Sequence, residues 1–196
     1  MIQVIRTLVL VGLSMSLVLM GKAQRLSDIE LQDAVSGEVF SLKEHRSAKA
    51  VVLIFSSLGC PFAKLYEERI RLLHEEYAGQ GFVFALVNPH AGRGTGENQA
   101  DMAKRAEEKG YPMPYLMDTD QEMTRYLEVT KIPEAVVISN GPTGYSVVYK
   151  GAIDNNPQSA DNAQMKYLDA ALGNILARKN PSPAATRAVG CNVRLQ

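Results

Sequence analysis

The hydrophobic and polar positions along the chain predict strands and helices in alternation. Two nearly continuous apolar runs, Ala50 to Ser56 and Gly81 to Asn88, are rich in β-branched residues and are typical of strands covered on both faces. Between them, charged residues separate apolar positions that recur at helical spacing: Phe62, Leu65, Tyr66, Ile70, Leu73 and Tyr77. Pro61 suits the first position of that helix, where its missing N–H is not needed.

Shorter patterns complete the expected fold. Two antiparallel hairpins are predicted, one over Leu26 to Leu42 and one joining Glu134 to Ser139 with Tyr145 to Lys150. Further helices are expected at Glu97 to Lys109, from a capping box at Thr119 to Glu122 through Tyr126, and at Ala160 to Arg178. The order predicts one α/β domain over residues 24–178, with a mixed central sheet, helices on both faces and an N-terminal β-hairpin. Residues 179–196 are expected to form an irregular tail.

The first 23 residues have the three parts of a secretory signal. Arg6 supplies a positive charge, Thr7 to Met20 is uncharged and apolar, and small residues stand at Gly21 and Ala23. The alternative is an uncleaved membrane anchor, but about fourteen residues in a helix span about 21 Å, less than a hydrocarbon core of about 30 Å. We therefore expect cleavage before Gln24, no stable membrane anchor, and an exported protein, either periplasmic or secreted.

Charge and histidine spacing narrow the range of partners. The chain has 21 basic and 21 acidic side chains, and removal of residues 1–23 leaves a net charge of −2, so neither a nucleic-acid groove nor a polybasic membrane surface is expected. His45, His74 and His90 share no ligand spacing with a cysteine, and no metal or cofactor is predicted. The glycines of Gly92 to Gly96 lack the ending of a phosphate-binding loop and are interpreted as a loop near the site.

The candidate chemistry rests on Cys60, with Cys191 as its possible partner. Cys60 is predicted to be the exposed N-cap of the helix that begins at Pro61, where the positive end of the helix dipole lowers the pKa of a thiol. Lys64, one turn later, adds a further positive charge. Two alternatives remain open: Cys60 as a small buried hydrophobic residue, and a purely structural disulfide between Cys60 and Cys191.

Four motifs resemble one known family. They are Phe55 to Pro61 after the first core strand, Thr130 to Pro133 before the second hairpin, Tyr149 to Asn155 after it, and Gly190-Cys191. Together they resemble the thioredoxin superfamily, and more narrowly exported redoxin-domain, peroxiredoxin-like proteins of the alkyl hydroperoxide reductase/thiol-specific antioxidant type. The resemblance implies a thioredoxin-like fold and a cis peptide bond at Ile132-Pro133. It also implies a substrate cleft lined by Ile132 and Pro133 together with Pro61 and Lys64; an ordinary trans-proline is the alternative.

The chain departs from the family patterns at three positions. Ala63 stands where a thioredoxin has its second cysteine, while Ser57 and Leu53 replace the threonine and proline of classical peroxiredoxins. The sequence therefore favours a thiol–disulfide oxidoreductase in which Cys60 attacks and Cys191 resolves, acting on protein disulfides or a small oxidant and recycled by an external thiol reductant. The alternatives are a peroxiredoxin-like thiol peroxidase and a non-catalytic binding or accessory protein with a structural disulfide.

Overall fold

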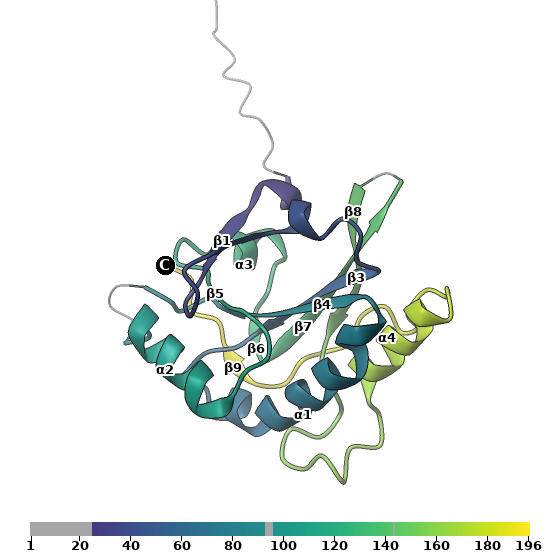
Figure 1. Cartoon of the computed structure of the whole chain (residues 1–196). Coiled ribbons are helices and arrows are strands. Elements are labelled where there is room, and N and C mark those ends of the chain that lie inside the picture. The colour runs from purple at the N-terminus through teal and green to yellow at the C-terminus, as the bar shows by residue number, and fades with distance from the viewer. Residues whose placement is uncertain (1–24, 93–95, 143) are drawn as a thin grey trace, which may run out of the picture.

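A mixed seven-stranded sheet forms the centre of the protein (Figure 1). The computed structural model describes residues 25–92, 96–142 and 144–196. The strand order is β2-β1-β5-β4-β3-β7-β8. The strands are β1 (Glu30–Asp33), β2 (Val39–Ser41), β3 (Ala50–Phe55), β4 (Phe82–Asn88), β5 (Tyr115–Met117), β7 (Glu134–Gly141) and β8 (Gly144–Gly151). A separate small sheet pairs β6 (Lys131–Ile132) with β9 (Cys191–Asn192).

Helices cover both faces of the sheet. The α-helices are α1 (Pro61–Tyr77), α2 (Gln99–Lys109), α3 (Glu122–Tyr126) and α4 (Tyr167–Leu176), and short 3-10 turns are η1 (Leu26–Asp28), η2 (Leu42–His45) and η3 (Ala78–Gln80). In Figure 1, α1, α2 and α4 lie along the lower side of the sheet and α3 lies on the opposite side. The α/β thioredoxin-like fold predicted from the sequence is confirmed.

The central strand β3 explains this layered packing. All six of its residues are buried, and alternate side chains enter two different hydrophobic clusters. Val52 and Ile54 pack in the cluster that also contains residues of α1, α2 and α4, whereas Leu53 and Phe55 pack in the cluster that contains Met123 of α3. A continuous apolar run is therefore what a strand between two layers requires.

Several boundaries differ from the predictions. β5 was not predicted, because three residues are too few to show a period. The helix expected from Glu97 begins at Gln99, with Asn98 as its N-cap, and α4 begins at Tyr167 rather than Ala160. On α1, Leu65 is 48% exposed while Ala63 is buried, so the apolar face is narrower than its spacing predicted.

The predicted capping box at Thr119 to Glu122 is wrong. The carboxylate of Asp118 instead accepts hydrogen bonds from the backbone N–H groups of Met123 (3.2 Å) and Thr124 (2.8 Å). The N-cap position itself, Gln121, has left-handed backbone geometry and no side-chain cap. Asp118 is buried, which raises the pKa of its carboxyl group. The helix start is thus held by an acidic residue three positions before Gln121.

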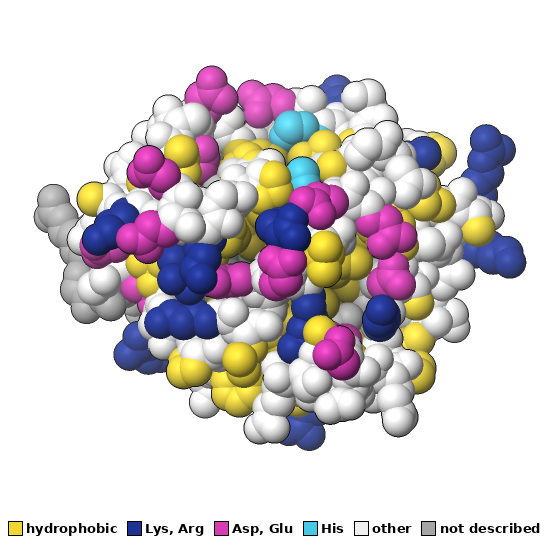
Figure 2. Space-filling model, turned by 60° about the horizontal axis from the view of Figure 1, so that its bottom comes forward, with side chains coloured by type: hydrophobic (Ala, Val, Ile, Leu, Met, Phe, Trp, Pro, Cys, Tyr) yellow, Lys and Arg dark blue, Asp and Glu magenta, His cyan; other side chains and the backbone are white. Residues whose placement is uncertain are grey.

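The predicted signal segment, residues 1–23, lies outside the described residues. Among the residues that the structure describes, no helix combines the length and apolar character needed to cross a bilayer. The loop predicted at Gly92 to Gly96 is described only at its two ends. Figure 2 shows that acidic and basic side chains are interspersed over the face covered by the helices.

Candidate functional site: a disulfide at the start of α1

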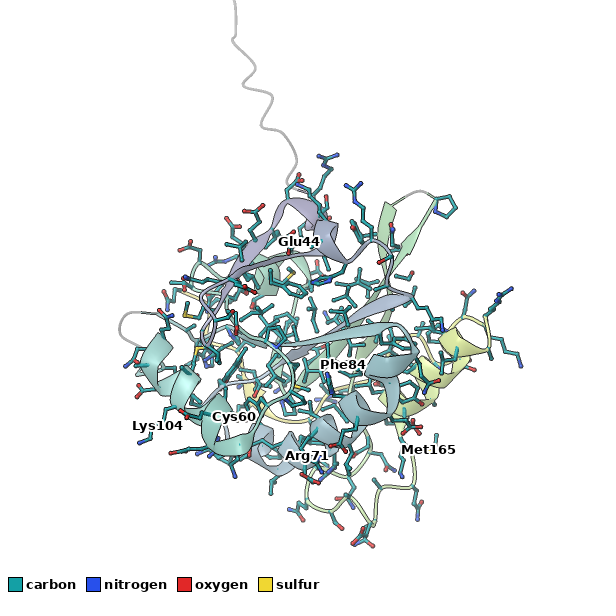
Figure 3. The ribbon with its side chains drawn as sticks, in the orientation of Figure 1. Glu44, Cys60, Arg71, Phe84, Lys104 and Met165 are labelled. Atoms are coloured by element: carbon teal, nitrogen blue, oxygen red, sulfur yellow. A yellow bond between two sulfur atoms is a disulfide. The ribbon has the colours of Figure 1, made fainter. Side chains whose placement is uncertain are left out.

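Cys60 is the N-cap of α1, as predicted. Its backbone is extended, Pro61 occupies the first helical position, and its side chain makes no capping hydrogen bond. The backbone N–H of Cys60 donates to the carbonyl oxygen of Ser57 at 3.3 Å, which closes the turn between β3 and α1. Figure 3 labels Cys60 where the start of α1 meets the C-terminal segment.

Cys60 and Cys191 form a disulfide across 131 residues, with their Cα atoms 6.0 Å apart. The prediction that Cys60 is exposed is wrong for this oxidised form, because only 2% of the residue is accessible. Its cover consists of Ala63 and Ile132 together with Phe62, Cys191 and Val193. Two of these covering residues belong to the C-terminal segment, so the burial of Cys60 depends partly on where that segment lies.

The peptide bond between Ile132 and Pro133 is cis, as the family resemblance implied. The carbonyl oxygen of Ile132 lies 3.3 Å from Cys60 Sγ, and Ile132 faces Cys191 in the antiparallel β6–β9 pair. The structure therefore brings four of the predicted site residues together: Cys60, Cys191, Ile132 and Pro133.

Pro61 and Lys64 also lie beside the disulfide, on the first turn of α1. Both are exposed. The Lys64 backbone N–H donates to the carbonyl oxygen of Cys60 at 3.4 Å, and its side chain lines an open hollow with Leu58 and Lys104. A role for either residue in binding a substrate stays a prediction.

Glu97 is a site residue that the sequence analysis missed. Its buried carboxylate accepts hydrogen bonds from the backbone N–H groups of Leu58 (2.9 Å) and Gly59 (3.0 Å), the two residues before Cys60. The side-chain amide of Asn88, at the end of β4, donates to the same carboxylate at 2.8 Å. The sequence analysis placed Glu97 inside the polar helix that ends at Lys109. Asparagine is a preferred N-cap residue, so Asn98 is the signal that would have placed Glu97 before the helix.

The C-terminal segment is irregular apart from β9, as predicted, but it is held firmly against the domain. His90 Nε2 accepts a hydrogen bond from the Arg194 backbone N–H at 3.1 Å, and the Gln121 side chain bonds both Arg194 and Gln196. His90 is 4% exposed. Burial lowers the pKa of its imidazole, with Glu97 acting to raise that pKa and Arg194 to lower it. A neutral imidazole is the form that can accept this bond.

Features away from the disulfide do not extend this site. A larger open hollow of about 810 Å³ lies between the second half of α1 and residues 153–169, and its lining includes Arg69, Asp154 and Lys166. Within the described part of the chain, no group of three or more histidine, cysteine, aspartate or glutamate side chains could hold a metal ion.

A cysteine at the N-cap of the helix after the first central strand, facing a cis-proline, defines a thioredoxin-like redoxin. The protein belongs to the AhpC/TSA family, whose model matches residues 23–147. Cys60 and Pro133 lie inside the matched region, whereas Cys191 lies beyond it. The partner cysteine is therefore carried by a part of the chain that the family model does not cover.

Solved structures of other proteins resemble most of the chain. A hypothetical protein from Sinorhizobium meliloti is 26% identical, with a TM-score of 0.77 over 88% of this chain and 93% of that one. An uncharacterized conserved protein from Geobacillus kaustophilus is 25% identical, with a TM-score of 0.77 over 86% and 88%. The Xanthomonas campestris bacterioferritin comigratory protein, at 17% identity and a TM-score of 0.57 over 78% and 93%, shares the fold. No curated protein matches the chain.

Proposed function

We propose that the protein is a thiol–disulfide oxidoreductase in which Cys60 attacks and Cys191 resolves. The observation that carries the proposal is the Cys60–Cys191 disulfide at the start of α1, beside the cis-proline Pro133. The N-terminus of a helix carries a positive partial charge that stabilises a thiolate, and the thiolate is the nucleophile in disulfide exchange. The second cysteine that Ala63 replaces is thus supplied by the C-terminal segment.

The proposed reaction transfers two electrons from the protein to a substrate disulfide. The Cys60 thiolate attacks one sulfur of the substrate, forms a mixed disulfide and releases the other sulfur as a thiolate. The Cys191 thiolate then attacks Cys60 Sγ, forms the Cys60–Cys191 disulfide and releases the second substrate thiol. The substrate disulfide is reduced to two thiols while the two cysteines are oxidised.

An external thiol reductant would return the protein to its reduced form by attacking Cys191. Cys191 is half-buried, whereas Cys60 is 2% exposed, so Cys191 is the more accessible residue of the two. Attack there expels Cys60 as the leaving group, and a thiolate stabilised by a helix N-terminus leaves faster. A second thiol of the reductant completes the exchange.

Membership of the AhpC/TSA family supports a second candidate, a thiol peroxidase. The Cys60 thiolate would attack a peroxide oxygen to give a sulfenic acid and an alcohol or water, and Cys191 would condense with the sulfenic acid and release water. Ser57 would stand in for the usual threonine; it is buried and its carbonyl oxygen accepts the Cys60 N–H.

We also propose that the protein is exported, to the periplasm or outside the cell. Residues 1–23 read as a secretory signal, and disulfides persist in oxidising compartments. Fusion of residues 1–23 to a reporter enzyme that is active only after export tests this proposal. A fusion that is produced in the cell but shows no reporter activity would contradict it.

Cysteine variants test the proposed reaction. Reduced full-length protein is mixed with a disulfide-bonded protein or with hydrogen peroxide, and the products are identified by intact mass after alkylation. With the disulfide, Cys191→Ser should accumulate a mixed disulfide at Cys60, and Cys60→Ser should form none.

The other outcomes separate the candidates. Peroxide consumption that is lost in Cys60→Ser, without turnover of the protein disulfide, selects the peroxidase. A Cys60–Cys191 bond that a dithiol cannot open at neutral pH contradicts both enzymes and supports a structural disulfide in a binding or accessory protein.

A further inference from the structure

The C-terminal segment is anchored on both sides of Cys191. Upstream, the Thr186 backbone N–H donates to the carbonyl oxygen of Lys150 at 3.0 Å, and Thr186 Oγ1 accepts the N–H of Ala152 at 2.9 Å. Downstream, Arg194 and Gln196 bond to the domain. Residues 187–193 therefore form a bridge that carries Cys191 across Cys60.

Two buried side chains form the downstream anchor. His90 Nε2 accepts the Arg194 N–H at 3.1 Å, and the Gln121 amide nitrogen donates to the Arg194 carbonyl oxygen at 2.8 Å. Gln121 Oε1 also accepts the Gln196 N–H at 2.9 Å. Because an amide side chain both donates and accepts, Gln121 can bind backbone groups of both Arg194 and Gln196.

The domain also holds the His90 backbone and the Gln121 side chain. The His90 backbone N–H donates to Asn88 Oδ1 at 2.9 Å, and the Gln121 amide nitrogen also donates to the carbonyl oxygen of Pro89 at 2.7 Å. Gln121 is 1% exposed and Asn88 is fully buried. None of these contacts involves a sulfur atom, so reduction of the disulfide does not remove them.

We propose that His90 and Gln121 are positioning residues for Cys191. They hold the end of the chain so that a reduced Cys191 stays opposite Ile132, within reach of Cys60. This inference rests on the proposed function, in which Cys191 resolves. Between its two ends, the bridge pairs with β6, and the Val193 N–H donates to the carbonyl oxygen of Thr130 at 3.0 Å.

The physical consequence is a high effective concentration of Cys191 at Cys60. Two thiols joined only by a flexible chain of 131 residues would meet rarely, since the entropic cost of loop closure grows with the length of the chain. Docking of residues 194–196 adds to the Thr186 anchor and the β6–β9 pair, and meets part of that cost before the sulfur atoms react. The equilibrium between the disulfide and the dithiol should therefore depend on contacts made beyond Cys191.

Shortening the chain tests the proposal. In a variant that ends at Val193, Cys191 is retained but all bonds to His90 and Gln121 are lost. The fraction oxidised is measured in glutathione buffers, by alkylation and intact mass, and gives the effective concentration. We expect at least a tenfold decrease. The matched control is Leu195→Ser, which changes an exposed side chain and keeps the backbone bonds; it should stay within twofold of the unchanged protein.

A double-mutant cycle assigns the effect to Gln121. Gln121→Glu keeps an acceptor for Gln196 but loses the donor to Arg194 and to Pro89. It should lower the effective concentration in the full-length chain and have no further effect on the effective concentration in the shortened one, because the bond to Pro89 does not involve the segment. An equal effect in both chains, or a shortened chain within twofold of the full-length protein, would overturn the proposal. No substrate takes part in the equilibrium with glutathione. A Cys60 that does not react with substrate would therefore be detected in the turnover assay and would not change the effective concentration measured in glutathione buffers.

Discussion

Gly190, the residue before Cys191, lies too close to the cis-proline segment for any side chain. A Cβ atom at this position would lie 1.9 Å from the carbonyl oxygen of Ile132 and 3.1 Å from the nitrogen of Pro133. Glycine is the residue that allows another backbone to approach this closely. Gly190 therefore allows the close backbone approach that brings the Cys191 sulfur to Cys60.

Substitution of this glycine is expected to push the C-terminal segment away from β6. Gly190→Ala should lower the free energy of unfolding of the oxidised protein by about 2 kcal/mol, the size of a typical overpacking penalty, as measured by urea denaturation. Gly79→Ala is the matched control, because a Cβ there meets nothing within 4 Å. Equal stability of the two variants would show that the segment moves aside without cost.

At the scale of elements, α1 is joined to the segment after β8 by a buried ionic network. Asp154 accepts hydrogen bonds from the Tyr66 hydroxyl group at 2.8 Å and from Arg69 Nη1 at 2.5 Å. Arg69 also donates to the carbonyl oxygens of Asn156 and Pro157. The Arg69 and Asp154 side chains are 12% and 4% exposed, so their charges compensate each other away from water.

Substitution of two arginines of α1 should therefore have very different effects on the free energy of unfolding. Arg69→Ala leaves the buried Asp154 charge without its partner and should lower the free energy of unfolding by about 3 kcal/mol. Arg71→Ala removes only bonds to Glu68 and Glu75 on the surface of the same helix and should leave stability nearly unchanged. Thermal and urea denaturation of both variants measure the difference. A small effect of Arg69→Ala would mean that water replaces the arginine at Asp154.

At the scale of the whole molecule, three histidines couple folding to pH. Burial lowers the pKa of the imidazoles of His45, His74 and His90 below the usual 6.5. Below pH 6.5 the unfolded chain therefore binds more protons than the folded protein. Their contribution to stability is present in full above pH 6.5 and is lost as the pH falls through the lowered pKa values of the folded state.

The free energy of unfolding should accordingly be lower at pH 5.5 than at pH 7.5, with each histidine contributing at most about 1.4 kcal/mol per pH unit. His74→Phe isolates one contribution, since His74 packs edge-on against Phe84 and its Nδ1 has no hydrogen-bond partner among the described residues. This variant should show a weaker pH dependence than the unchanged protein in urea denaturation. An identical pH profile would exclude His74 as a source of the coupling.

The local pattern of the sequence determined the frame of the site. The apolar run of β3, the helical spacing of α1 and the proline at its first position were enough to place Cys60 at a helix N-cap. The cis-proline was implied by the family resemblance of the motif before β7. These features depend on residues that are neighbours along the chain, so their signals are visible in the sequence.

Tertiary structure alone decided what surrounds the sulfur of Cys60. The pairing with Cys191, the inward turn of Glu97 toward Leu58 and the seating of Arg194 on His90 join residues between 39 and 131 positions apart. No periodic pattern records such contacts, because they depend on how the loops at one end of the sheet pack together. For the same reason the exposure of Cys60 could not be read from its N-cap position, because it depends partly on a segment near the C-terminus of the chain.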